Sequence, residues 1–349
     1  MYGNQKGGIE LYLKQLTELD GVSGNEEKVR KFIEKEIEKY VDELKVDILG
    51  NLIACKKGTK SKRKIVIAAH MDEVGFMVTN VEDDGMLCFA PVGGVETQVM
   101  PGKVVRINGE IPGVIGFKAI HIQERDQILK PPSVDQMRIY IGAKSKEEAS
   151  KMVKIGDYVS FTTGYHQENG RATGKAFDDR AGCSVLMDII TLDNRYEDDV
   201  YFAFLVQEEV GLRGSAVVVE QIHPDIAIVI EGTTAGDDPE LPSYQWATHL
   251  GEGPAVTFMH RGYVINKRVY ESILKLAEKY SIPYQAKRRT AGGTDAARFA
   301  RTGAGTAAGV ISVPARYIHS PVSMIDLNDY KNTVLLVEKI LEEGEAFAK

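Results

Sequence analysis

The sequence is poor in cysteine and tryptophan and lacks any long apolar run. Its three cysteines, Cys55, Cys88 and Cys183, lie far apart and form no CxxC pair, which argues against a thiolate zinc site and a disulfide framework. A single tryptophan leaves little indole surface for stacking on sugars. No run of roughly 18 apolar residues occurs, and the first residues contain no apolar core of a signal peptide. These absences predict a cytoplasmic protein.

An excess of positive charge is also missing. The net charge is −7, which argues against a general binder of nucleic acid or of anionic membranes, because both surfaces would repel the chain. The composition, with 43% hydrophobic and 27% charged residues, is ordinary for a folded protein. A length of 349 residues suggests about two domains.

Apolar periodicity on both sides of an irregular middle segment predicts an α/β domain. Helical spacing is present at 9–19 and 26–37, and the apolar run 65–69 fits a strand buried on both faces. Further along, strands alternate with helices. The expected strands are 46–48, 52–55, 200–207, 226–230, 255–259 and 306–310, and the expected helices are 181–192, one from about 214, 267–280 and 327–343. This alternation predicts a mostly parallel central sheet flanked by helices.

The middle segment has a different texture. From about 75 to 163, short β-like pieces alternate with glycine and proline, and the one expected helix, near 146–152, is short. This pattern predicts a small β-rich domain inserted into the larger one. The expected division is a catalytic α/β domain formed by 1–72 and 165–349, with the insertion at 73–164.

His70 directly follows the apolar strand 65–69. Ligands of open α/β sheets bind beyond the carboxyl ends of strands, which is where His70 is expected. A histidine that binds a metal needs an acceptor for its other ring nitrogen, and Asp72 can supply one. Taken alone, this pair fits a histidine satisfied by a local hydrogen bond equally well.

Acidic residues stand at comparable places further along the chain. Asp178 precedes the helix at 181–192, where it fits either an N-cap or a bridging metal ligand, with Arg180 balancing its charge. Glu208 and Glu209 end an apolar strand, where one can bind a metal while the other stays free as a general base. Glu231 follows the strand at 226–230.

His319, in the loop Arg316–Pro321, is unremarkable alone. Together, however, the two histidines and the acids at strand ends and at a helix start form a set of nitrogen and oxygen donors that can hold two divalent ions. We therefore predict a binuclear metal centre that carries out metal-assisted hydrolysis.

Four sequence motifs resemble the M42 family of metallo-aminopeptidases, which includes TET-type peptidases and glutamyl or deblocking aminopeptidases. The motifs are AAHMDEVGFMV (68–78), GKAFDDRAG (174–182), QEEVGLRG (207–214) and RYIHSP (316–321). The resemblance spans nearly the whole chain with compatible order and spacing, so the set is specific.

The resemblance implies a role for each residue of the centre. It implies two divalent ions, with zinc or cobalt expected ahead of manganese. The five implied ligands are His70, Asp178, Glu209, Glu231 and His319. Asp178 would bridge the ions. Glu208 would be the general base, and Asp72 would orient His70.

The resemblance also implies a binding site and an assembly. Gly293 and Thr294 match a segment near the side chain of the substrate's first residue. The inserted domain would make dimer contacts in a homo-oligomer, either a dimer or a dodecamer built from such dimers. His121 matches a histidine common in that insertion, and it receives no role.

Three alternatives stay open. The family usually has Asp where this chain has Glu231, which leaves room for a carboxypeptidase or deacylase type of amide hydrolase. A glycoside hydrolase of the endoglucanase type would use two carboxylates and no metal, and it would leave both histidines without a role. A catalytically idle assembly protein would not need a complete ligand set.

Arg288 and Arg289 would favour acidic substrates, but they fit ordinary surface arginines better.

Overall fold

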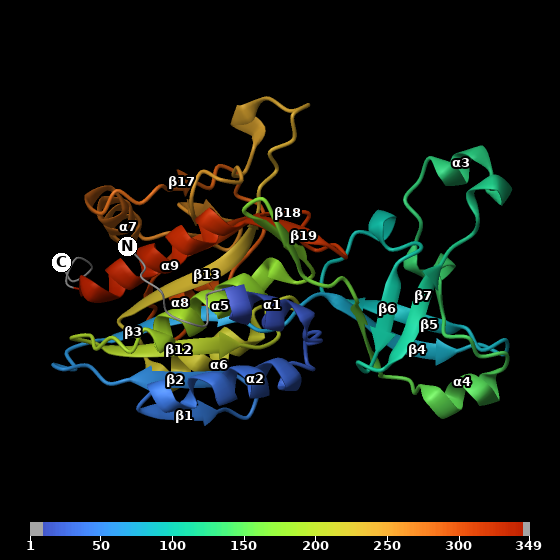
Figure 1. Ribbon diagram of the computed structural model, residues 1–349, viewed down its shortest axis with the longest axis horizontal. Coiled ribbons are helices and arrows are strands. Elements are labelled where there is room, and N and C mark those ends of the chain that lie inside the picture. Colours follow the sequence, from blue (N-terminus) through green and yellow to red (C-terminus); the bar gives the residue numbers. More distant parts are fainter. Residues whose placement is uncertain (1–9, 345–349) are drawn as a thin grey trace.

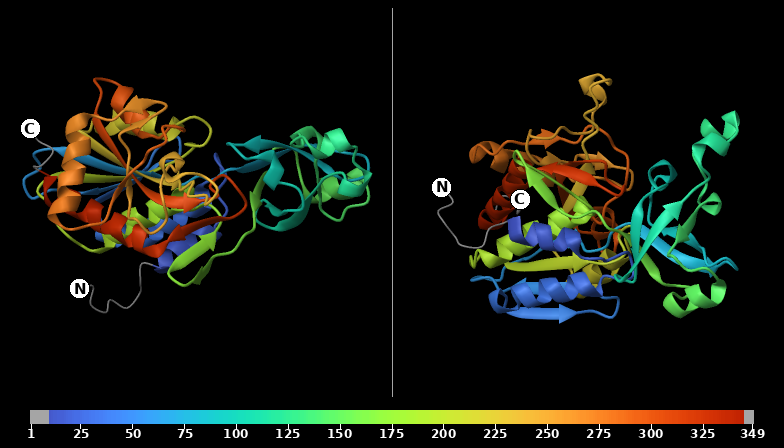
Figure 2. Two further views of the ribbon diagram at one scale, coloured as in Figure 1. Left: turned by 90° about the horizontal axis from the view of Figure 1, so that it is seen from above. Right: turned by 45° about the vertical axis from the view of Figure 1, so that its right-hand side comes forward.

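The computed structural model describes residues 10–344, so Ile9 of the first expected helix lies outside the described residues. Figure 1 shows two parts: a helix-covered sheet that carries both ends of the chain, and a separate barrel. The two views of Figure 2 agree that the barrel stands beside the sheet. The predicted α/β class with a central, mostly parallel sheet is confirmed.

The middle of the central sheet is parallel. The four neighbouring strands run in the order β12 (Asp199–Leu205), β3 (Lys64–His70), β13 (Ile226–Thr234) and β18 (Ala307–Arg316). Strand β3 is buried along almost its whole length, which explains its continuous apolar sequence. Because these strands are parallel, their carboxyl ends meet at one edge of the sheet.

Antiparallel strands flank this parallel core. On one side lie β2 (Leu52–Lys56) and β1 (Glu43–Val46), and on the other lie β19 (Ser323–Asp326), β11 (Arg171–Gly174) and β10 (His166–Glu168). Short strands complete the domain: β14 (Ala255–Val256), β15 (Met259–His260), β16 (Tyr263–Val264) and β17 (Gln285–Ala286).

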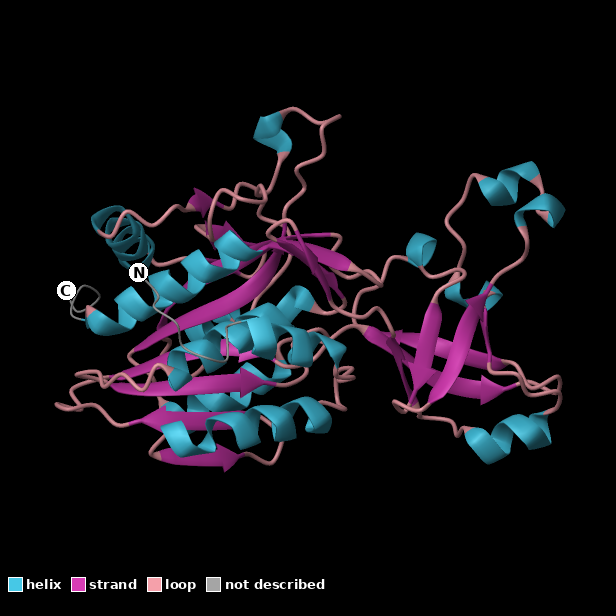
Figure 3. Ribbon diagram, in the orientation of Figure 1, coloured by secondary structure: helices cyan, strands magenta, loops and turns pink. Residues whose placement is uncertain are grey.

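Helices cover both faces of the sheet (Figure 3). One apolar cluster joins the sheet to α1 (Glu10–Glu18), α2 (Glu27–Ile37), α5 (Phe177–Thr191), α7 (Lys267–Lys279) and α9 (Leu327–Glu342). A second cluster joins the other face to α6 (Arg213–Ile222) and α8 (Ala296–Arg301). Helix α5 is buried along most of its length, so it fixes the position of its first residues firmly.

The barrel has its own core. Its strands close in the order β4 (Gly75–Val81), β5 (Leu87–Val92), β8 (Arg138–Tyr140), β7 (Ile111–Gly116), β6 (Val104–Ile107) and β9 (Tyr158–Phe161). Phe76 lies at its centre, with ring centroids 5.1 Å from Phe89 and 5.3 Å from Phe161. The remaining helices of this part are α3 (Arg125–Ile128) and α4 (Lys146–Met152), and every strand of the barrel falls within 73–164.

Some expected boundaries are wrong. The strand expected at 46–48 ends at Val46, and Ile48 is fully exposed in the turn that leads to β2. The strand expected at 255–259 is two short strands, β14 and β15. The hairpin β10–β11 and strand β19 were not expected, because these short segments carry little apolar alternation.

Among helices in the described part, none has both the length and the apolar character to cross a membrane.

Candidate metal centre

His70 is buried at the carboxyl end of β3. Its Nε2 lies 3.4 Å from Asp178 Oδ1 and 3.6 Å from Glu231 Oε2. Its Nδ1 lies 3.1 Å from the main-chain oxygen of Asp72 and 3.4 Å from Asp72 Oδ1. Nδ1 can donate its proton to these acceptors, and in that tautomer Nε2, which faces Asp178 and Glu231, could bind a cation.

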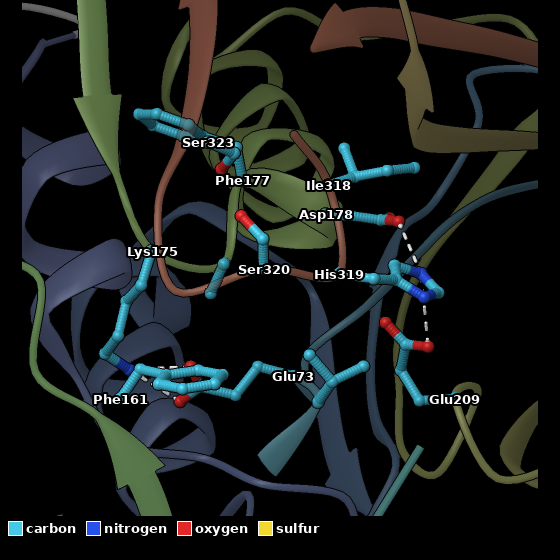
Figure 4. Close-up of a pocket in the computed structure, with 12 residues that line it drawn as sticks. Glu73, Phe161, Lys175, Phe177, Asp178, Glu209, Ile318, His319, Ser320 and Ser323 are labelled. Carbon is cyan, nitrogen blue, oxygen red and sulfur yellow. Dashed lines mark hydrogen bonds and ion pairs between the residues drawn. The ribbon is translucent and has the colours of Figure 1, made fainter. Parts of the chain in front are cut away.

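Asp178 lies between the two histidines. Its Oδ2 is 3.4 Å from Nε2 of His319, while its other oxygen faces His70. Figure 4 shows His319 between Asp178 and Glu209. Oε2 of Glu209 lies 3.5 Å from Nε2 of His319. Asp178 can face both ways because it and Asp179 leave helical geometry inside the first turn of α5. The peptide bond between the two residues is cis.

The candidate ligand atoms form two compact groups. The donors of His70, Asp178 and Glu231 lie within 4.8 Å of one another, and so do those of Asp178, Glu209 and His319. Asp178 belongs to both groups. A further grouping joins His70 to Glu208 and Glu209. The structure thus brings together all five residues expected as ligands, with Glu208 beside them.

Asp72 holds the loop that follows β12. Its two carboxylate oxygens accept hydrogen bonds from the main-chain N–H groups of Glu208, at 3.0 Å, and Glu209, at 3.1 Å. The hydroxyl of Ser23 donates to the same carboxylate at 2.6 Å. Asp72 therefore fixes the backbone of both glutamates as well as facing His70. Sequence reasoning found the contact with His70 but not the contacts with the loop.

The centre holds a surplus of buried negative charge. Asp178 Oδ1 and Glu231 Oε1 are buried without a hydrogen-bond partner among the described residues. Burial raises the pKa of Glu231 well above its usual range, and burial together with Asp178 raises the pKa of Glu209 to about 7. Although burial lowers the pKa of His319, its contacts with Asp178 and Glu209 raise it to about 9. Buried carboxyl groups with unpartnered oxygens and raised pKa values fit a site for divalent cations.

Arg180 does not balance the charge of Asp178. It is fully buried and points the other way, donating through Nε to the main-chain oxygen of Met71 at 2.7 Å. Its terminal nitrogen lies 3.5 Å from Glu73, whose carboxylate also pairs with the buried Lys175 at 2.6 Å. These cations support the chain behind the centre, where β3 leads into the barrel.

A cavity of about 880 Å³ opens onto the centre. Its wall includes Glu208 as well as Gly293 and Thr294, the two residues expected to bind substrate. The Thr294 hydroxyl lies 3.3 Å from Nε2 of the buried His260. The cavity also includes Lys287, which sequence reasoning missed because nothing in its local pattern sets it apart from a surface lysine.

The model of the M42 glutamyl aminopeptidase family matches residues 50–336 of the sequence. The chain belongs to this family. Family membership makes it a peptide hydrolase of the aminopeptidase type, and it confirms the resemblance drawn from the four motifs.

Full-length relatives support the M42 assignment. The lysyl aminopeptidase of Pyrococcus furiosus is 34% identical, over 95% of this chain and 96% of the relative. The TET aminopeptidase of a Thaumarchaeota archaeon has a TM-score of 0.93 and 35% identity, covering 97% of this chain and 98% of that one. A Thermotoga maritima structure named endoglucanase is 52% identical with a TM-score of 0.82, covering 97% and 98%. Since the family model and the other relatives are peptidases, the glycoside hydrolase alternative is not supported.

Proposed function

We propose that the protein is an aminopeptidase that uses two divalent metal ions to release N-terminal residues from peptides. The observation that carries the proposal is the placement of Asp178, which turns one carboxylate oxygen toward His70 and the other toward His319. Glu231 would complete the first ion's site, and Glu209 the second. Zinc or cobalt, and also manganese, suit such nitrogen and oxygen donors.

Bound ions would supply Lewis acidity, lowering the pKa of water and polarising the scissile carbonyl. The protein supplies the rest. Glu208 takes a proton from the attacking water and returns it to the leaving amine, as a general base and then a general acid. Asp72 keeps Glu208 in place through its main-chain N–H. The acidic wall of the cavity attracts the positively charged α-amine of the substrate, which favours cleavage next to a free N-terminus.

Replacing Glu208 with Gln tests the mechanism. The amide cannot accept a proton, so we expect kcat to fall by roughly 10²- to 10⁴-fold. The ions bound per chain, measured by elemental analysis, should not change. The surface variant Glu271→Gln is the control and should keep full activity. Turnover of the Glu208→Gln protein at the level of the control would remove Glu208 from the mechanism.

Blocked substrates separate aminopeptidase action from the carboxypeptidase or deacylase type. Glu231 is one methylene longer than the Asp usual in the family, so the position of its carboxylate bears on this choice. We expect the metal-loaded protein to cleave peptides with a free N-terminus and to spare the same peptides after N-acetylation. A preference for acetylated peptides would favour the alternative. Chelation should abolish cleavage, and added zinc or cobalt should restore it.

We also propose that the protein forms a homo-oligomer through the inserted barrel. The arm that contains α3 exposes the large apolar side chains of Ile120, Ile122, Ile128 and Leu129. An exposed apolar surface of this kind marks a protein–protein contact site. The TET peptidase of Pyrococcus horikoshii assembles into a tetrahedron or an octahedral shell. A dimer that builds a dodecamer, working on peptides in the cytoplasm, is the corresponding proposal for this chain.

A further inference from the structure

Lys287 lies in the wall of the cavity that opens onto the metal centre. It follows strand β17, and its main-chain N–H donates to the oxygen of Val256 at 3.1 Å, which anchors the residue beside β14. The side chain is partly buried. Across the described part of the chain, no carboxylate lies within ion-pair distance of its ammonium group, and no acceptor within hydrogen-bond distance.

Other buried lysines of this protein are satisfied. Lys175 pairs with Glu73, and the ammonium of Lys56 donates to the main-chain oxygen of Ile190 at 2.7 Å. A partly buried ammonium without a partner costs free energy, and this burial lowers the pKa of Lys287 even though Glu231 and Asp178 act to raise it. The fold thus keeps an unpaired cation beside the place where the substrate enters.

We propose that Lys287 is the specificity-determining residue of a subsite that binds an acidic side chain on the first residue of the substrate. This inference rests on the proposed aminopeptidase function. The cavity wall contains the carboxyl groups of Glu96, Glu208 and the proposed ligands, and Lys287 adds a positive charge to it. An N-terminal glutamate or aspartate carries the matching charges, with its α-amine facing the acids and its side-chain carboxylate facing the lysine.

Arg289 adds positive charge at the rim of the same cavity. Its Nε donates to the main-chain oxygen of Gln245 at 2.9 Å, which holds the guanidinium in place. Family membership does not decide which N-terminal residue is preferred. The family model is named for glutamyl aminopeptidases, whereas one relative is a lysyl aminopeptidase. The choice depends on the residues that line this cavity, and at the positions of Lys287 and Arg289 their positive charges oppose a lysine side chain.

A counter-ion role toward Glu231 does not explain Lys287. The two groups form no ion pair, and Glu231 Oε1 stays without a partner although the lysine is near enough to influence it electrostatically. Divalent ions would also neutralise Glu231 directly. A free carboxylate from the substrate can approach the ammonium to hydrogen-bonding distance, which Glu231 does not do.

The test compares the variant Lys287→Met with the control Arg288→Met, its exposed neighbour, which does not line this cavity. The substrates are glutamyl, glutaminyl, leucyl and lysyl p-nitroanilides, with zinc- or cobalt-loaded protein. A hydrogen bond to a charged group is worth enough for a roughly 10- to 100-fold effect. We expect Lys287→Met to lower kcat/KM for the glutamyl substrate by that factor and to leave the leucyl substrate within about threefold. Arg288→Met should change neither.

Three results would overturn the inference. One is an equal loss on glutamyl and leucyl substrates, since Lys287 would then act on the reaction in general. Another is no preference for glutamyl over glutaminyl substrate in the unchanged protein. The third is a loss confined to peptides with a free C-terminal carboxylate and absent from their amides, which would assign Lys287 to that carboxylate.

A binding measurement separates this inference from the proposed function. Calorimetry with the metal-loaded Glu208→Gln protein should show tighter binding of glutamate than of glutamine, and adding Lys287→Met should remove the difference. If the unchanged protein hydrolyses no aminoacyl substrate while this binding difference persists, the aminopeptidase proposal fails and the acidic subsite stands. If hydrolysis proceeds without a binding difference, the subsite fails alone.

Discussion

Asp188 is a buried carboxyl group away from the metal centre. It lies on α5, where its Oδ2 accepts a hydrogen bond of 2.5 Å from the hydroxyl of Tyr330 on α9. Burial raises the pKa of Asp188 to about 7, against the opposing effect of Tyr330. An unfolded Asp has a pKa of about 3.9. Between that pH and about pH 7, the folded protein therefore keeps a proton on Asp188 that the unfolded protein has lost. The stability that comes from this group is complete below the lower value and is lost as the pH rises toward 7.

The variant Asp188→Asn should remove this pH dependence. Across the window from about pH 4 to 7, the free energy of unfolding of the unchanged protein should fall relative to the variant by up to about 1.4 kcal/mol per pH unit. Urea unfolding at several pH values measures the difference, and contributions from all other groups cancel in it. A difference that does not change with pH would contradict the prediction.

Single residues at the centre were predictable to different degrees. His70, Glu209 and Glu231 were found because each acid or histidine follows a buried strand, a position that packing does not explain. Lys287 was not found, because what sets it apart is the lack of an ion-pair partner for its ammonium group. That lack depends on how elements distant in sequence pack around it. The contacts of Asp72 with the loop of Glu208 escaped prediction for the same reason.

At the scale of elements, strand β13 and helix α5 approach each other closely at the centre. A Cβ atom added to Gly232 would lie 2.8 Å from Cα of Asp178 and 2.9 Å from its Cβ. Neither contact is tolerable, and α5 is too well packed to move away. Glycine at 232 is therefore needed for Asp178 to stand between the two histidines.

The variant Gly232→Ala should displace Asp178. We expect a loss of metal affinity of roughly tenfold or more together with a fall in kcat, because a displaced bridging ligand affects both ion sites. Gly164→Ala is a suitable control, since nothing lies within 4 Å of the added Cβ there. Titration with zinc, followed by activity, measures the effect. Equal metal affinity in both variants would contradict this account of the packing.

Elements with strong apolar patterns were predicted well, and weakly patterned ones were not. Strand β3 and helix α9 have long apolar patterns that specify their type. Strand β19 has four residues and pairs with β18 and β11, so its conformation depends on neighbours that sequence alone does not reveal. The non-helical start of α5 at Asp178 and Asp179 likewise comes from the surrounding packing and has no local sequence signal.

On the scale of the whole molecule, the barrel presents the exposed apolar arm at a distance from the sheet (Figure 1). Substituting Ile120 and Ile128 with Asp should reduce the size of the assembly, because charge would replace apolar contact area. Multi-angle light scattering measures the mass in solution. Ile155→Asp is the matched control, since Ile155 is exposed on the barrel beyond α4, away from the arm. If the double variant keeps the mass of the control, the arm is not the contact surface.

The five ligands of the proposed centre are spread over most of the chain, and His319 is the last to be made. During synthesis, His70, Asp178 and Glu231 emerge first, so one ion site has all its side chains before the other. The second proposed site needs His319, which lies between β18 and β19. A nascent chain would therefore have all the side chains of the second proposed ion site only after nearly the whole central sheet has been synthesised.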